Sequence, residues 1–297
     1  MSIISECESI CSVCGNANRY PMLRSTIALI NPDLDSRPSE MTRSTMVCWV
    51  QVCPSCGYAA RDVSDPFACG QEFLQSDEYK LFSPLEPVGS LTKAFIWKAR
   101  INDRTQKFVA SFFDYLRAAW DADDNGDSHW SKQARLLALE QFDKVDQVDR
   151  TDDLLLIRTD LLRKTEQFER LLREYESVRF DGDQREEFGK VIAFQLQKAR
   201  IWDTATYTFG DVALAMDKPK PAEDTKEQTQ EQTPKQTPDS PQTQQNNDPL
   251  RAKSKPRVTV CGISRSGLGA NKPKPKIDPP QTQWIGWFIV WANGLWR

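Results

Sequence analysis

The sequence predicts a mixed α+β protein, with a small β domain at the N-terminus, an all-α domain after it and a disordered C-terminal tail. Three observations lead to this fold class. Two closely spaced cysteine pairs lie near the N-terminus. Apolar side chains then recur with a helical period over residues 91–216. Residues 217–283 have few large apolar side chains to offset the entropy cost of ordering.

The cysteine spacing predicts the first domain. Cys11 and Cys14 form one C-x-x-C-G sequence, and Cys53 and Cys56 form a second of the C-P-x-C-G form. Such a turn presents two thiolates to one ion, and its glycine permits a positive φ while backbone N–H groups point at sulfur. Two such turns are typical of a tetrahedral four-thiolate zinc site. We therefore expect a zinc ribbon in which these four cysteines hold a structural Zn²⁺.

The two cysteine pairs are separated by 38 residues, a longer interval than the roughly 15–20 residues of a compact ribbon. A hairpin and a loop must therefore lie between them. Residues 46–52 are rich in β-branched and aromatic side chains and predict a strand that leads into Cys53. Residues 31–45 have the composition of a loop. A closed four-sulfur site has no open position for water, so it stabilises a fold and does not catalyse.

Two other interpretations of the cysteines are buried free thiols and a redox pair. The chain has eight cysteines, and residues 1–10 have neither the basic nor the apolar region of a secretory signal. We therefore expect a reducing, cytoplasmic setting, where paired cysteine clusters favour metal over disulfides. No run of 18 apolar residues is present, so no transmembrane helix is expected.

Residues 91–216 predict a series of helices joined by short turns. Turn residues occur at 123–127, 149–151 and 181–183. One helix is expected over residues 152–164, and the apolar faces of the others are marked by four sets of residues: Phe108, Phe112, Leu116 and Trp120; Ala134, Leu137, Gln141 and Val145; Phe168, Leu171, Leu172, Tyr175 and Val178; Phe188, Val191, Ile192, Gln195 and Ala199.

Helices in this arrangement predict antiparallel hairpins stacked as in a tetratricopeptide solenoid. Internal repetition is weak. Residues 104–108 are similar to residues 164–168, but the offset is 60 residues, whereas a tetratricopeptide repeat has about 34. The predicted organisation is a zinc ribbon over 1–66, a connector over 67–90, a helical-repeat-like domain over 91–216, a disordered tail over 217–283 and a Trp-rich apolar end over 284–297.

The motifs of common enzyme classes are incomplete in this sequence. Residues 121–126 match the start of an EF-hand loop, but Lys132 stands where calcium requires a bidentate Glu. His129 is the only histidine, so no second imidazole is available for a catalytic metal. Residues 262–269 are rich in glycine but do not end in the Lys-Ser/Thr pair of a phosphate-binding loop. We therefore expect no catalytic residues and a non-enzymatic protein.

The charge distribution argues against nucleic-acid binding by the folded part. Residues 1–216 carry 26 basic and 34 acidic side chains, and residues 217–297 carry 13 basic and 8 acidic ones. An acidic surface is a poor partner for a phosphate backbone, so only the tail could supply the charge. The apolar end from Trp284 to Trp296 spans 13 residues, too few to cross a membrane. The sequence does not distinguish contact of this end with a membrane surface from docking on the folded part, and membrane contact is not the leading expectation.

Several segments resemble one bacterial family. The matching segments are residues 11–15, 31–38, 41–45, 49–60, 116–120, 123–127 and 161–168. Together they resemble an uncharacterised bacterial zinc-ribbon family of unknown function, whose members combine a C-x-x-C-G with a C-P-x-C-G-Y-A/C-A segment and tetratricopeptide-like helices. The resemblance covers about residues 8–215. It implies zinc and a helical repeat but no substrate, and the tail departs from the family pattern.

The leading hypothesis is a zinc-binding adaptor or scaffold that binds a protein partner through its helical domain. One alternative is a redox sensor that uses the C-x-x-C pairs to release zinc on oxidation. A second alternative is a zinc ribbon associated with nucleic acid. The sequence leaves the partner, the pathway and the oligomeric state open.

Overall fold

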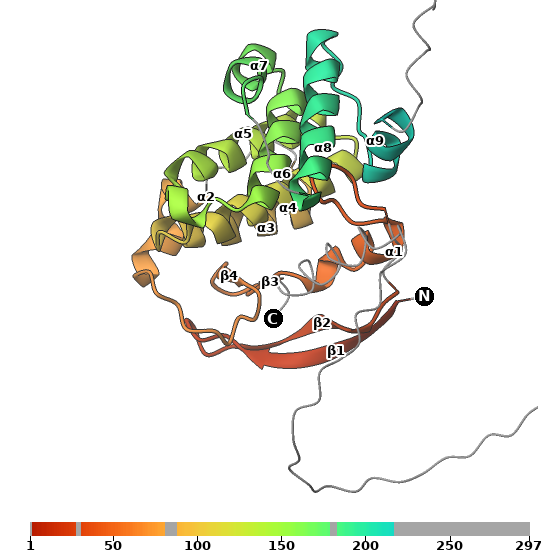
Figure 1. Ribbon diagram of the computed structural model, residues 1–297. Helices are drawn as coiled ribbons and strands as arrows, with labels where there is room; N and C mark the ends of the chain where they lie inside the picture. Colours follow the sequence, from red (N-terminus) through yellow and green to blue (C-terminus); the bar gives the residue numbers. More distant parts are fainter. Residues whose placement is uncertain (1, 28–30, 81–87, 179–182, 217–297) are drawn as a thin grey trace, which may run out of the picture. The chain divides into compact units, whose positions relative to one another are not determined.

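The computed structural model describes residues 2–27, 31–80, 88–178 and 183–216 (Figure 1). All of these residues belong to one compact unit. They form a β-rich N-terminal part followed by helices, in agreement with the predicted α+β class. The predicted tail over 217–283 and the Trp-rich end over 284–297 lie outside the described residues. No helix in the described ranges is long and apolar enough to cross a membrane.

The chain begins with an antiparallel hairpin formed by β1 (Ile3–Ile10) and β2 (Ala17–Ser25). Ile10 pairs with Ala17 at the end of the hairpin, and Cys7 pairs with Tyr20 in its middle. The first cysteine pair therefore lies in the turn that joins the two strands. The sequence gives little signal for this hairpin, because β1 lacks a regular alternation of polar and apolar residues and is largely exposed.

A second, shorter hairpin carries the second cysteine pair. Its strands are β3 (Gln51–Val52) and β4 (Ala59–Ala60), which pair in an antiparallel register. The strand predicted over 46–52 is wrong for its first part, since residues 46–48 form the 3-10 helix η1 (Met46–Cys48). Trp49 explains the helical turn: its backbone N–H donates to the carbonyl oxygen of Met46 at 3.0 Å, and its Nε1 donates to Oγ1 of Thr45 at 3.1 Å.

The segment predicted as a loop over 31–45 contains the short helix α1 (Glu40–Arg43) and is partly buried. Leu34 is 1 % exposed and Asp35 is fully buried, so this segment does not run over the surface as a loop usually does. The connector holds η2 (Gln71–Gln75) and α2 (Asp77–Lys80), consistent with its predicted helical potential.

Eight further elements complete the described chain. They are α3 (Ser90–Arg104), α4 (Phe108–Asp124), α5 (Ser128–Lys144), η3 (Gln147–Asp149), α6 (Asp152–Lys164), α7 (Phe168–Tyr175), α8 (Asp183–Arg200) and α9 (Phe209–Met216). Three-residue connections place α3 against α4 and α4 against α5, and α6 packs on α8 (Figure 1). The helices bury an apolar core that contains three of the four residues of the predicted α4 face, Phe112, Leu116 and Trp120, while Phe108 is half-buried outside it. The prediction of helices over this region is confirmed.

Two of the helix-joining turns have the same structure at the 60-residue offset seen in the sequence. Gln106 and Glu166 have φ values of 58° and 64°, in the left-handed region. One residue earlier, Oγ1 of Thr105 donates to the carbonyl oxygen of Ile101 at 2.9 Å, and Oγ1 of Thr165 makes the equivalent bond to Leu161 at 2.8 Å. The N–H groups that follow each turn bond back into the preceding helix. The sequence similarity therefore marks a repeated way of ending a helix.

A buried ion pair repeats at the same offset. Nζ of Lys98 on α3 donates to Oδ1 of Asp114 on α4 at 2.8 Å. Sixty residues later, Nη2 of Arg158 on α6 donates to Oε2 of Glu174 on α7. Each pair joins the two helices on either side of a repeated turn. The two helix pairs are thus similar in their cross-helix polar contacts as well as in their turns.

Candidate metal centre

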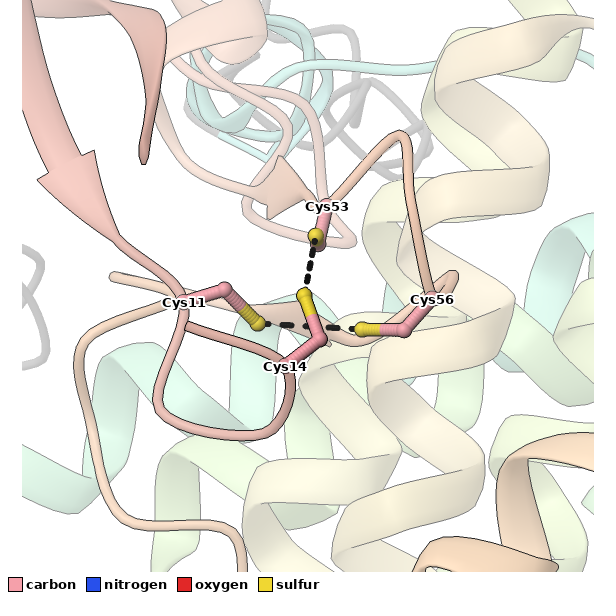
Figure 2. A group of neighbouring side chains, drawn as sticks. All are labelled: Cys11, Cys14, Cys53 and Cys56. Carbon is pink, nitrogen blue, oxygen red and sulfur yellow. Dashed lines mark hydrogen bonds between the residues drawn. The ribbon is translucent and has the colours of Figure 1, made fainter. Parts of the chain in front are cut away.

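The four sulfur atoms of the predicted ligands converge (Figure 2). Sγ of Cys11 lies 3.7 Å from Sγ of Cys56, and Sγ of Cys14 lies 3.5 Å from Sγ of Cys53. All four sulfur atoms lie within 4.8 Å of one another. Four thiolates placed tetrahedrally about 2.3 Å from a zinc ion are about 3.8 Å apart. The cluster therefore has the dimensions of a four-sulfur metal site, and it can hold a metal ion.

The two cysteine turns have the same backbone structure. In each turn the glycine N–H donates to the carbonyl oxygen of the first cysteine at 2.9 Å, from Gly15 to Cys11 and from Gly57 to Cys53. Gly15 and Gly57 have φ values of 75° and 79°. A residue with a side chain rarely adopts this conformation, so the glycine after each C-x-x-C is required by the turn.

Each turn is held in place by its own hairpin. The N–H of Cys11 donates to the carbonyl oxygen of Asn16 at 2.9 Å, which closes the end of the β1–β2 hairpin. The N–H of Cys53 makes the equivalent bond to Tyr58 between β3 and β4. The first turn is also joined to the segment after β4, because the N–H of Ser12 donates to the carbonyl oxygen of Val63 at 2.9 Å. Backbone hydrogen bonds thus shape both turns that carry the sulfur atoms.

A small apolar core supports the cluster from the side of the helices. Cys11 and Cys53 are almost completely buried, whereas Cys14 and Cys56 are half-buried. The ring of Tyr79 stacks on that of Trp97 in α3, with ring centres 5.8 Å apart. The other buried members of this core are Tyr20, Tyr58, Ala60, Val63, Phe73 and Leu74. Cys14 and Cys56 are therefore the two more exposed members of the cluster.

The protonation of the thiols differs across the cluster. Burial raises the pKa of the Cys11 thiol, and burial also raises the pKa of Cys56 to about 12. At Cys53 burial acts in the same direction, but the backbone N–H groups of Cys56 and Ser55 outweigh it and lower the pKa to about 7. A thiolate is the form that binds metal, and a bound cation displaces the proton of a coordinating thiol. Backbone donors therefore prepare one ligand, and metal binding would have to deprotonate the others.

The remaining described cysteines lie outside the cluster. Cys7, Cys48 and Cys69 are half-buried free thiols, and none of them joins the group of closely spaced sulfurs. Cys48 lies in η1 and packs partly against the main core, not in a strand as predicted. The ligand set predicted from the sequence is the set that the described residues bring together. Its occupation by zinc stays a prediction.

The acids of the EF-hand-like segment and His129 have structural contacts in the protein. Asp121 and Asp123 lie at the end of α4, where Asp121 accepts a hydrogen bond from Oγ1 of Thr92 and Asp123 contacts Arg135. These acids are partnered by the protein and do not form a calcium loop. His129 is exposed in the first turn of α5, where its ring meets the edge of Trp130.

A buried charge network was not foreseen from the sequence. Oδ2 of the fully buried Asp35 lies 3.3 Å from Nη2 of Arg135 on α5 and 3.2 Å from Nζ of Lys164 on α6. Burial opposes ionisation of this carboxyl, but Lys164 and Arg135 outweigh burial and hold the pKa of Asp35 well below its usual range. These ion pairs connect the segment before α1 to α5 and α6. No sequence signal identifies it, because its members lie 100 and 129 residues apart.

Comparison of the chain with protein-family models, with curated proteins and with solved structures finds no match in any of the three.

Proposed function

We propose that this protein is a zinc-stabilised, non-enzymatic adaptor, in which Cys11, Cys14, Cys53 and Cys56 hold one structural Zn²⁺ and the helical domain binds a protein partner. The observation that carries the proposal is the convergence of four sulfur atoms from two hairpin turns at separations that suit a tetrahedral site. Tetrahedral sulfur ligation is typical of structural zinc.

The position of the cluster supports a structural role for the metal. Bound zinc would join the β1–β2 hairpin to the β3–β4 hairpin, two elements separated by a long stretch of chain. Fixing such a closed loop removes conformational freedom from the unfolded chain, and metal binding energy then becomes folding energy. With four protein sulfurs bound, no coordination position is left for a substrate or an activated water molecule.

The redox alternative receives less support from the geometry. A redox C-x-x-C motif brings together the two cysteines of one motif. Here the two short sulfur–sulfur contacts join a cysteine of one turn to a cysteine of the other, Cys11 with Cys56 and Cys14 with Cys53. That pattern suits four ligands around a shared centre. The nucleic-acid alternative gains no support from the acidic charge of residues 1–216.

The adaptor role rests on the helical part of the chain. Consecutive helices joined by short, similar turns form the kind of array that other proteins use to bind extended partners. The tetratricopeptide-like character of the array and its resemblance to the bacterial zinc-ribbon family belong to this proposal. Cross-linking of the full chain in its source cells, followed by mass spectrometry, tests the role. The proposal expects cross-links from one partner to lysines of α3–α8, and cross-links confined to other segments contradict it.

The metal is tested by elemental analysis of the full chain purified without added metal. The proposal expects one zinc per chain, lost when Cys53 and Cys56 are both changed to Ser. The control is Cys48→Ser, which removes a half-buried thiol outside the cluster and should keep the zinc. A metal-free wild-type protein, or equal zinc in all three proteins, contradicts the proposal.

A further inference from the structure

The helical part contains a cavity of about 250 Å³. None of its lining residues belongs to the cysteine turns. Its lining residues are all polar or charged: Asp123, Ser128, Ser131, Lys132, Arg135, Lys164, Glu166, Thr204 and Thr206. Ligand cavities are usually lined mostly by apolar side chains and have volumes of about 300–1,000 Å³. This cavity therefore suits a small and strongly polar ligand.

The charged groups of the lining are already paired with one another. Nη2 of Arg135 donates to Asp123 at 2.6 Å and Nζ of Lys164 lies 3.2 Å from Asp35, which is also an ion-pair partner of Arg135. Nζ of Lys132 donates to Oε2 of Glu166 at 2.6 Å. A charged ligand would have to break one of these pairs and leave a charge unpartnered, which is costly for the buried ones. The charge balance favours a neutral ligand.

Three hydroxyl groups of the lining are free. Within the described part of the chain, the hydroxyl groups of Ser128, Thr204 and Thr206 have no hydrogen-bond partner. Ser128 begins α5, and the two threonines lie in the segment between α8 and α9. Hydroxyl groups both donate and accept, so three of them in the lining suit a ligand that is itself rich in hydroxyl groups.

An exposed tryptophan lies close in sequence to one segment of the lining. Trp202 is 72 % exposed and has a left-handed φ of 59°, which a side chain rarely adopts. Its ring packs on that of Phe168 at 5.2 Å between centres, two residues after Glu166, and Trp202 itself lies two residues before Thr204. Trp202 thus belongs to the segment that carries Thr204, and its ring contacts the helix that follows Glu166. An exposed aromatic face in such a segment is suited to a ligand with both hydroxyl groups and a C–H face.

We propose that this cavity binds a neutral polyhydroxy ligand of monosaccharide size, held by the free hydroxyl groups of Ser128, Thr204 and Thr206, by the Lys132–Glu166 pair and by the face of Trp202. The ligand exchanges hydrogen bonds with the wall and leaves the buried ion pairs intact. This site is separate from the cysteine cluster and does not depend on the proposed adaptor role.

The test is ligand-observed saturation-transfer NMR on the full chain with D-glucose, D-galactose, D-mannose and myo-inositol. The proposal expects saturable binding of at least one of them, without displacement by inorganic phosphate. Trp202→Ala and Thr204→Val/Thr206→Val should each weaken this binding by about twofold to tenfold, the effect of losing one stacking contact or hydrogen bond. All replaced side chains are exposed, so the fold should be retained.

A matched pair of lysines provides the control. Lys132 and Lys144 both lie on α5, are 42 % and 44 % exposed, and each pairs with one acidic residue. Lys132→Met should weaken binding and Lys144→Met should leave it unchanged. The proposal is overturned if none of the four probes binds, if phosphate displaces the bound probe, or if the cavity variants bind as tightly as the wild-type protein.

Discussion

The phenol group of Tyr79 donates a hydrogen bond to the carbonyl oxygen of Gly57 at 2.7 Å. Tyr79 belongs to α2 and also stacks on Trp97 of α3, while Gly57 closes the second cysteine turn. This bond connects the cysteine cluster to the first long helix. The helical part therefore helps to fix the position of two of the four sulfur atoms.

Loss of this bond should measurably weaken the fold. Tyr79→Phe keeps the ring and removes the hydroxyl group, so we expect the free energy of unfolding to fall by about 0.5–1.5 kcal/mol in urea titrations. Tyr115→Phe is the control, because the buried hydroxyl group of Tyr115 has no hydrogen-bond partner in the structure. Removal of this hydroxyl group should leave the free energy of unfolding almost unchanged or raise it. Equal losses in the two variants would show that the Tyr79–Gly57 bond has no special role.

The buried charge network should be more sensitive than the surface ion pairs. Asp35→Asn leaves Arg135 and Lys164 without their shared partner, and breaking a buried pair in this way costs about 3–5 kcal/mol. Glu166→Gln removes one side of an exposed pair and should cost less than about 1 kcal/mol. Thermal or urea unfolding of the two variants measures the difference. Similar small losses in both would mean that the segment before α1 is not anchored through Asp35.

Asp33 should give the protein an unusual dependence on pH. Burial and the neighbouring charge of Asp35 raise the pKa of Asp33 to about 6. The folded state therefore binds a proton that the unfolded state releases near pH 4, so this residue stabilises the fold at low pH and the effect is lost as pH rises through 6. Asp33→Asn should flatten the change in stability between pH 4 and 6. The exposed Asp77→Asn variant should retain the wild-type slope, and an unchanged slope in Asp33→Asn would contradict the assignment.

Two glycine substitutions should have opposite effects. At Gly57 the left-handed φ of 79° disfavours any side chain, although an added Cβ would meet no atom within 4 Å. Gly57→Ala should therefore destabilise the protein by about 1–2 kcal/mol and weaken metal binding. Gly189 lies within α8 and also has free space around it, so Gly189→Ala should stabilise by about 0.5–1 kcal/mol. Urea titrations measure both, and a neutral Gly57→Ala would show that the turn tolerates another conformation.

The sequence predicts best where local chemistry determines structure. Helix α6 begins and ends at the predicted residues, and its start is fixed by Thr151, whose Oγ1 accepts from the N–H of Leu154. The four clustered cysteines could be predicted because each C-x-x-C-G turn is specified by five consecutive residues. These features depend on neighbours in the chain.

The features that were missed depend on distant contacts. Residues 46–50 have strand-forming side chains, but their burial against the main core and the Trp49–Thr45 hydrogen bond favour a helical turn. The free hydroxyl groups of the cavity and the charges around Asp35 come together only when separate helices pack. A local sequence pattern cannot predict contacts between residues that are so far apart in the chain. The resemblance to a bacterial family stays a prediction.

The central claim is that four cysteine sulfurs alone bind one zinc ion, and X-ray absorption at the zinc edge tests it most directly. Measured on the full chain purified without added metal, the spectrum should show four sulfur atoms at about 2.3 Å from zinc and no nitrogen or oxygen ligand. Fewer than four sulfurs, or a mixed shell containing nitrogen or oxygen, would contradict the claim and point to a site that is open to water or to another residue.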